Sequence, residues 1–250
     1  MKGNTLKKCL NGNQLKLIAI IAMTIDHLTW VLFPGFQTVW WVLGLHIIGR
    51  LTAPIMWFFI AEGCFYTHDR RKYLMRLFGF AVVSHFAYDF AFGIPFFDAS
   101  YGFLNRTSVM WSLALAAVIT FVWQIEKIST PLKFVILFSA CIISLPSDWS
   151  SIAVMAPFFI YNHRGKFKLQ ALDIVIWTAV YALVYFFAID KLYAILQMFT
   201  FLSVPLLFLY NGKRGKWKGM KWLFYVYYPA HLVIIGVLRL LLHGDIRLIA

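Results

Sequence analysis

The chain has 250 residues, of which 62% are hydrophobic, 19% are aromatic and only 13% are charged. This composition excludes an ordinary soluble domain, and the apolar runs are too continuous for membrane β-strands, so the sequence predicts a helical membrane protein. The net charge of +13 does not indicate a nucleic-acid partner, because the basic residues fall almost wholly between the apolar segments. The three cysteines lack metal-ligand spacing, so we expect neither a metal site nor a disulfide framework.

Apolar segments long enough to cross a hydrocarbon core of about 30 Å follow one another along the chain. We expect spans at 14–33, 39–62, 73–92, 108–125, 169–188, 192–210 and 222–242. Two shorter segments, 131–145 and 152–161, flank the turn 146–150 and are either two thin spans or one re-entrant hairpin. Residues 1–250 are therefore predicted to form a single domain, an all-α polytopic transmembrane bundle of about nine spans.

The basic residues lie in alternate loops, and cytoplasmic loops are the ones that carry excess Lys and Arg. With a cytoplasmic N-terminus, 18 of the 23 basic residues lie on that side. They are Lys2, Lys7, Lys8, Lys16, Arg70, Arg71, Lys72, Arg76, Lys127, Lys133, Arg164, Lys166, Lys168, Lys213, Arg214, Lys216, Lys218 and Lys221. The opposite side keeps Arg106, Lys191, Arg239 and Arg247, and Arg50 lies within a span. We therefore predict a cytoplasmic N-terminus and contact of the basic loops with anionic lipids.

Ionisable residues also lie inside the predicted spans, where an ionised side chain costs at least about 2.5 kcal/mol. They are Asp26, His27, His46, Arg50, His85, Asp89 and His231. Counted from the cytoplasmic end of each span at about 1.5 Å per residue, all of them fall between the middle and the outer half of the membrane. We therefore expect them to meet in one water-accessible cavity inside the bundle.

Spacing along the helices predicts how these residues pair. His46 and Arg50 are four residues apart and share a helix face, as do His85 and Asp89, whereas Asp26 points about 100° away from its neighbour. We expect Asp26 to pair across helices with Arg50, since a lone arginine at that depth is too costly. For His46 and His85, an interhelical hydrogen bond is an equally good explanation.

Aromatic residues near the spans suggest supporting roles. Trp149, like other tryptophans at segment ends, is predicted to be an interface anchor. Tyr227 and Tyr228 precede His231 by four and three residues, so they are placed to orient its ring.

Three short motifs carry a family resemblance: MTIDH at 23–27, GRLTAPIMWFF at 49–59 and YPAHL at 228–232. In this order they resemble the TraX family of membrane proteins, whose namesake acetylates the N-terminus of the conjugative F pilin subunit. That family is similar to the broader acyltransferase-3 group, in which ten residues separate a basic residue from a histidine of the first span. Lys16 and His27 have this spacing, although the group usually has arginine at the first position and more spans.

The resemblance implies a membrane acetyltransferase of the bacterial cytoplasmic membrane. It would move an acetyl group from cytoplasmic acetyl-coenzyme A to an amine or hydroxyl acceptor, with His27 as general base beside Asp26. Supporting or acceptor-binding roles are expected for Arg50, His231, His46, His85 and Asp89. Binding of coenzyme A is expected from Lys16, Glu62, Arg70, Arg71 and Lys72. Direct attack by the acceptor is preferred over an acetyl-histidine intermediate.

The sequence leaves several alternatives open. Buried Asp, His and Arg residues are also typical of proton-coupled small-molecule transporters, and the same residues would be merely structural in a scaffold for surface-fibre assembly. The acceptor is undetermined between a pilin N-terminus, an envelope glycan and a small amine, and so is the oligomeric state.

Overall fold

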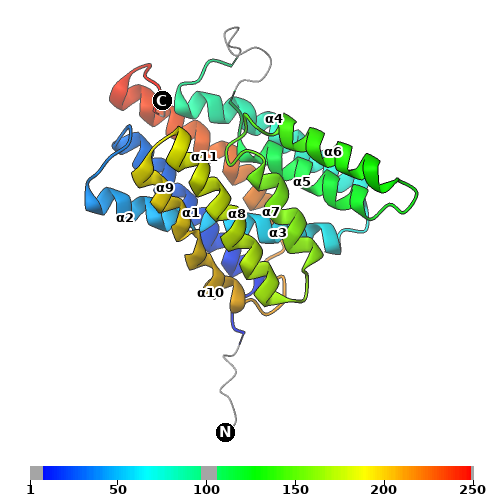
Figure 1. Cartoon of the computed structure of the whole chain (residues 1–250). Coiled ribbons are helices and arrows are strands. Elements are labelled where there is room, and N and C mark those ends of the chain that lie inside the picture. Colours follow the sequence, from blue (N-terminus) through cyan, green and yellow to red (C-terminus); the bar gives the residue numbers. More distant parts are fainter. Residues whose placement is uncertain (1–7, 97–105, 249–250) are drawn as a thin grey trace.

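The computed structural model describes residues 8–96 and 106–248, and this part of the chain is helical apart from turns and two isolated bridges (Figure 1). The α-helices are α1 (Gly12–Leu32), α2 (Trp40–Gly49), α3 (Thr52–Tyr66), α4 (Arg70–Phe92), α5 (Val109–Trp123), α6 (Thr130–Ile143), α7 (Ile152–Asn162), α8 (Phe167–Ala188), α9 (Lys191–Met198), α10 (Ser203–Phe208) and α11 (Met220–His243). A 3₁₀ turn, η1 (Phe199–Leu202), joins α9 to α10.

The predicted all-α membrane architecture is confirmed within the described residues. Five segments there are both long and apolar enough to cross a membrane, namely Gly12–Leu32, Trp40–Tyr66, Phe167–Ala188, Lys191–Phe208 and Trp222–His243. The helices α5, α6 and α7 are apolar but shorter, and α4 is long but carries charged residues at both ends. The count of nine spans and the cytoplasmic N-terminus remain predictions.

The segment predicted as one span at 39–62 corresponds to a single candidate span, Trp40–Tyr66, which is interrupted by a turn at Arg50 and Leu51. The first helix, α2, ends at Gly49, and α3 begins at Thr52. Pro54 lies in the first turn of α3, where its missing N–H costs no helical hydrogen bond. The break places Arg50 at a helix end, from which its side chain reaches α1.

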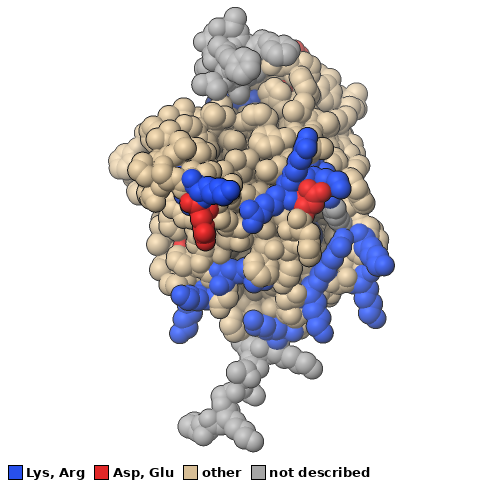
Figure 2. All heavy atoms as spheres, turned by 90° about the vertical axis from the view of Figure 1, so that its right-hand side faces the viewer, with Lys and Arg blue, Asp and Glu red and all other residues tan. Residues whose placement is uncertain are grey.

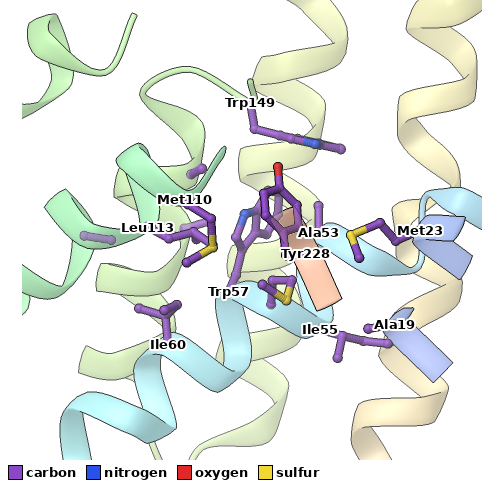
Figure 3. Packing of buried hydrophobic residues seen from close by; sticks show 14 of the residues in the cluster. Ala19, Met23, Ala53, Ile55, Trp57, Ile60, Met110, Leu113, Trp149 and Tyr228 are labelled. Atoms are coloured by element: carbon purple, nitrogen blue, oxygen red, sulfur yellow. The ribbon is translucent and has the colours of Figure 1, made fainter. Parts of the chain in front are cut away.

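The helices pack around a core of large aromatic and small aliphatic side chains. The first helix contacts α2, α3 and α11, α4 lies against α11 and α5, and α7 lies against α3, α5 and α8. Fully buried alanines such as Ala116 and Ala153 let α5 and α7 approach closely, as is usual where helices meet in membranes. Figure 3 shows Trp57 of α3 at the centre of this core, close to Met110 and Tyr228.

The helix α6 lies at the edge of the bundle, and Ala140 is its one buried residue. Its apolar side chains, for example Phe138, are exposed to the surroundings that lipid would occupy. Through the turn that follows, it forms a hairpin with α7 (Figure 1). Two thin spans and one re-entrant hairpin remain the alternative predictions for this segment.

Basic residues gather at the end of the bundle where α1 begins. We call this the basic end: the start of α1, the α3–α4 loop, the α5–α6 and α7–α8 loops, and the α10–α11 loop. Figure 2 shows Lys and Arg side chains over the lower half of one face, toward this end. Hydrogen bonds from the backbone of α1 to Lys213 and Arg214 tie two of these segments together. Lys2 and Lys7, which the sequence assigns to the same side, lie outside the described residues.

A glycine allows α1 and α2 to approach closely. A Cβ atom at Gly49 would collide with the side chain of Asp26, whereas one at Gly44 on the same helix would meet nothing within 4 Å. Small residues at such crossings permit close backbone contact between helices. The absence of a side chain at position 49 therefore makes room for Asp26 beneath the end of α2.

We expect Gly49→Ala to lower the free energy of unfolding by about 1–3 kcal/mol, because the added methyl group overpacks the α1–α2 contact. The matched control is Gly44→Ala, which should be neutral or slightly stabilising. Thermal unfolding in detergent would measure both variants, and equal melting temperatures would contradict the close packing described here.

Candidate active site

A cavity of about 630 Å³ lies within the bundle, and we call it the inner cavity. Its walls come from α1, the α2–α3 break, α3, α4, α8, α9, α11 and the turn between α6 and α7. Its chemically active lining residues are Asp26, His27, Arg50, Arg106, Asp148 and Gln197. Aromatic and aliphatic side chains form most of the remaining lining, so these groups meet in a mainly apolar enclosure.

Asp26 and Arg50 form an ion pair in the wall of this cavity, as predicted from their depth within the membrane spans. Nη2 of Arg50 lies 2.8 Å from both carboxylate oxygens of Asp26. The other guanidinium nitrogens donate to the side chain of Gln197 at 3.0 Å and to the backbone oxygen of His46 at 3.2 Å. Both charged side chains are nearly buried, so each one compensates the desolvation of the other.

His46 contributes to the same pair from behind the cavity wall. Its Nδ1 lies 2.8 Å from Oδ1 of Asp26, and its side chain packs against Trp30 and Tyr193. Because an ionised carboxylate only accepts hydrogen bonds, Nδ1 of His46 carries the proton in this contact. Fully buried and outside the cavity lining, His46 holds Asp26 in place.

His27 forms a hydrogen-bonded chain with the last helix. Its Nδ1 lies 2.7 Å from Nε2 of His231, and Nδ1 of His231 lies 3.0 Å from the backbone oxygen of Tyr227. A carbonyl oxygen only accepts, so Nδ1 of His231 carries a proton and its Nε2, in the neutral ring, is an acceptor. His27 must then donate through Nδ1, which leaves its Nε2 with a lone pair.

This tautomer makes Nε2 of His27 the basic atom of the site. The ring lines the inner cavity, and within the described chain no hydrogen bond occupies Nε2. Tyr227 also stacks on His231 with ring centroids 5.2 Å apart and bonds Thr24 of α1 at 2.6 Å. The predicted influence of Tyr227 on the orientation of His231 is therefore present in the structure.

The turn between α6 and α7 reaches the cavity, which the sequence did not indicate. Trp149, predicted to be an interface anchor, is instead buried in the cavity wall and stacks on Tyr181 at 4.6 Å. That prediction was wrong because position at a segment end does not reveal a turn that folds inward. Its neighbour Asp148 also lines the cavity, and burial raises the pKa of this carboxyl to about 6.

His85 and Asp89 do not join the other ionisable residues, so the expectation of one common cavity is wrong for this pair. Their side chains lie 3.5 Å apart on α4 and are absent from the cavity lining among the described residues. The α4 residues that do reach the cavity are Tyr88 and Phe92. Asp89 follows Tyr88 directly, so its side chain points about 100° away around the helix.

A second cavity, of about 570 Å³, opens at the basic end, and we call it the basic cavity. Its charged lining residues are Lys16, Glu62, Arg76 and Arg214. Apolar side chains of α3, α4 and α5 form most of the remaining wall. Met56 of α3 lines both cavities, so this residue belongs to the wall of each.

The residues that the sequence assigned to coenzyme A binding divide into two groups. Lys16 and Glu62 line the basic cavity, although Glu62 is bound to Arg164 at 2.7 Å. The remaining candidates lie outside its lining: Arg71 is exposed, Arg70 bonds Gln124 at 2.7 Å, and Lys72 contacts Asp69 at 3.2 Å. The sequence pointed to no binding role for Arg76 and Arg214, because only the fold brings α4 and the α10–α11 loop together.

The Asp26–Arg50 pair can be tested by a double-mutant cycle with Asp26→Leu and Arg50→Met. Each single substitution leaves a buried charge without its partner and should cost about 3–5 kcal/mol of unfolding free energy. The double variant removes both charges, so its loss should be smaller than the sum by about 1–3 kcal/mol. Additive losses in detergent unfolding would show that the two residues are not coupled.

Comparison with known proteins agrees with the resemblance carried by the three motifs. A family model described as TraX protein matches residues 11–239. The probable fimbrial assembly protein FimC, serogroup H1, of Dichelobacter nodosus is 31% identical over 229 residues, which cover 89% of this chain and 93% of that protein. No solved structure matches the chain. The predicted family is thereby confirmed, and the chain belongs to the TraX family.

Proposed function

We propose that this protein is a membrane acetyltransferase that uses acetyl-coenzyme A from the cytoplasm and acts on an acceptor in the inner cavity. The observation that carries the proposal is that two cavities of different chemistry share the wall residue Met56. One cavity holds the basic nitrogen of His27 and the other is rimmed with cationic side chains. A donor with an anionic head and a reactive tip suits this arrangement, because its two ends need different surroundings.

The basic cavity suits coenzyme A in its chemistry. Lys16, Arg76 and Arg214 can receive phosphate groups through charge-assisted hydrogen bonds. The apolar walls beyond them suit a slender, mostly uncharged arm that leads toward Met56. Lys16 also lies over the rings of Phe59 and Phe224, at 5.0 and 5.8 Å, which holds its ammonium group at the cavity.

His27 is the proposed general base. As the acceptor attacks the thioester carbonyl carbon, Nε2 of His27 takes the proton from its N–H or O–H group. The new C–N or C–O bond forms, the C–S bond breaks, and the proton passes from Nε2 to the departing thiolate. His231 keeps His27 in the required tautomer through the hydrogen bond to Nδ1.

Asp26 has a positioning role in this scheme, whereas Arg50 contacts the reacting group. Both oxygens of Asp26 are engaged by Arg50 and His46, so Asp26 does not act as a base itself. Arg50 keeps one N–H of Nη1 beyond its bond to Gln197 and lines the cavity, so it is placed to stabilise negative charge on the thioester oxygen. In the runner-up mechanism, Nε2 of His27 attacks first and forms an acetyl-enzyme.

The relative of this chain is named as a fimbrial assembly protein, which favours a fibre subunit of the cell surface as acceptor. Together with the apolar helices, the relative also supports the proposed location in the bacterial cytoplasmic membrane. Family and relative together support a role in fibre production more than proton-coupled transport of a small molecule. Within that role, an enzyme would need the imidazole of His27 for acetyl transfer, whereas a scaffold would not.

The substitution His27→Ala should abolish transfer, with a loss of about 10²-fold or more at saturating donor, because the general base is removed. Membranes containing the protein would be incubated with labelled acetyl-coenzyme A and envelope fractions, and labelled products identified. The control is His243→Ala, which removes a histidine bonded to the backbone of Val31 outside both cavities. Unchanged labelling with correctly inserted His27→Ala protein would favour the scaffold.

Charge removal in the basic cavity should weaken donor binding rather than chemistry. We expect Arg76→Gln and Arg214→Gln each to raise the KM for acetyl-coenzyme A about ten-fold, with little change in kcat. The matched control is Arg71→Gln, because Arg71 is exposed and outside the cavity lining. A larger effect at Arg71 than at Arg76 and Arg214 would instead favour the assignment expected from the sequence.

A further inference from the structure

One face of α3 borders both cavities. The residues on this face are spaced three, four and three positions apart, namely Ala53, Met56, Ile60 and Gly63. Ala53 lines the inner cavity, Ile60 lines the basic cavity, and Met56 lines both. Ala53 and Ile60 are separated by about 10 Å along the helix. The lining of one cavity therefore gives way to that of the other around Met56.

Two neighbouring helices divide between the cavities in the same way. On α5, Val109 lines the inner cavity and the next residue, Met110, lines the basic cavity. On α11, Tyr228 lines the inner cavity, whereas Tyr225, one turn earlier, lines the basic cavity. On all three helices, residues of a single turn thus belong to different cavities. The two spaces are separated there by little more than side chains.

Met56 is suited to a partition that can open. Its side chain is buried, unbranched and has three rotatable bonds, so it changes conformation more readily than a branched or aromatic side chain. Figure 3 shows two further methionines, Met23 and Met110, on opposite sides of Trp57, the residue that follows Met56. Met23 lines the inner cavity and Met110 the basic cavity, so flexible side chains border both spaces.

In the proposed reaction, the acyl group of the donor has to pass this partition. The phosphates of the donor bind in the basic cavity, whereas His27 lines the inner cavity. The acyl group is the leading end of the donor, so it meets Met56 first. An unbranched acyl group is no wider than the arm behind it, but a branch next to the carbonyl carbon widens the tip. A close-packed wall discriminates against one added methyl group by about ten-fold or more.

We propose that Met56 is a specificity-determining residue that selects the donor by the width of its acyl group, so that unbranched groups pass and branched groups do not. The inference rests on the proposed function and adds an acyl specificity that the function leaves open. It depends on the walls of the two cavities and not on the nature of the acceptor. The transfer step is unchanged: the bond from the acyl carbon to the acceptor forms and the C–S bond breaks.

The test compares two isomeric donors, n-butyryl-coenzyme A and isobutyryl-coenzyme A, which differ only in branching. Membranes containing the full-length protein would be incubated with each donor, labelled in the acyl group, and with envelope fractions as the source of acceptor. The wild type should transfer the n-butyryl group with a kcat/KM about ten-fold or more above that of the isobutyryl group. Met56→Ala should reduce this ratio to about three-fold or less, because the shorter side chain leaves a wider passage.

Two further variants separate width from other effects. Met56→Leu keeps a similar volume and should keep the discrimination. Met75→Ala should also leave the ratio unchanged, because Met75 is exposed on α4 and lies outside both linings. Desulfo-coenzyme A should raise the melting temperature of wild type and Met56→Ala equally, since the phosphate-binding side chains are intact. Equal use of the two isomers by the wild type, or an unchanged ratio in Met56→Ala with normal binding, would overturn the inference.

A chemical readout follows the passage without turnover. N-ethylmaleimide would label Met56→Cys in a chain whose own cysteines, Cys9, Cys64 and Cys141, are replaced by alanine. At saturation, desulfo-coenzyme A, which keeps the arm but lacks the thiol, should slow labelling about ten-fold or more. Adenosine 3′,5′-bisphosphate, which lacks the arm, should not slow it.

The outcomes of this labelling distinguish the two proposals. Equal labelling with both compounds, or no labelling without them, would place position 56 off the path of the arm and overturn the inference. Protection of position 56 by desulfo-coenzyme A, together with no acyl transfer by the wild type from any donor, would count against the proposed function instead.

Discussion

A charged side chain in the interior of a membrane bundle is stable only beside a partner, and Asp26 and Arg50 satisfy this constraint across two helices. Much of the local architecture follows from their contact. The predicted second span breaks directly after Gly49, which lets the arginine leave the helix end and meet the carboxylate. His46 and Gln197 complete the hydrogen bonds of the pair. The result is a fixed polar wall beside His27.

The two cavities differ in the charge that they offer. The basic cavity presents three cationic side chains at one end of the bundle, whereas the inner cavity contains two Asp and two Arg side chains and is therefore balanced. Such a division suits a reaction whose two substrates approach from different directions and meet at Met56.

The sequence predicted the helical membrane class, the family and the Asp26–Arg50 pair, because these depend on composition, motifs and the high cost of a buried charge. It also predicted that His231 would lie near His27, from depth alone. It did not predict Asp148 and Trp149 as cavity residues, since a short polar turn carries no signal of folding inward. The depth of Asp89 in its predicted span likewise led to the wrong prediction that it would reach the common cavity. Depth does not give the direction of a side chain around its helix, which is set by the neighbours that pack there.

In the proposed reaction, the histidine pair determines where positive charge would reside. In many enzymes a carboxylate supports the basic histidine, but here the support is a neutral imidazole whose own N–H is anchored to the carbonyl of Tyr227. Before reaction the pair carries no charge, so it needs no counter-ion in the apolar interior. When Nε2 of His27 gains a proton, the short contact to His231 allows the positive charge to be shared by two rings on the first and last helices. The proposed catalysis and the packing of α1 against α11 thus depend on the same hydrogen bond.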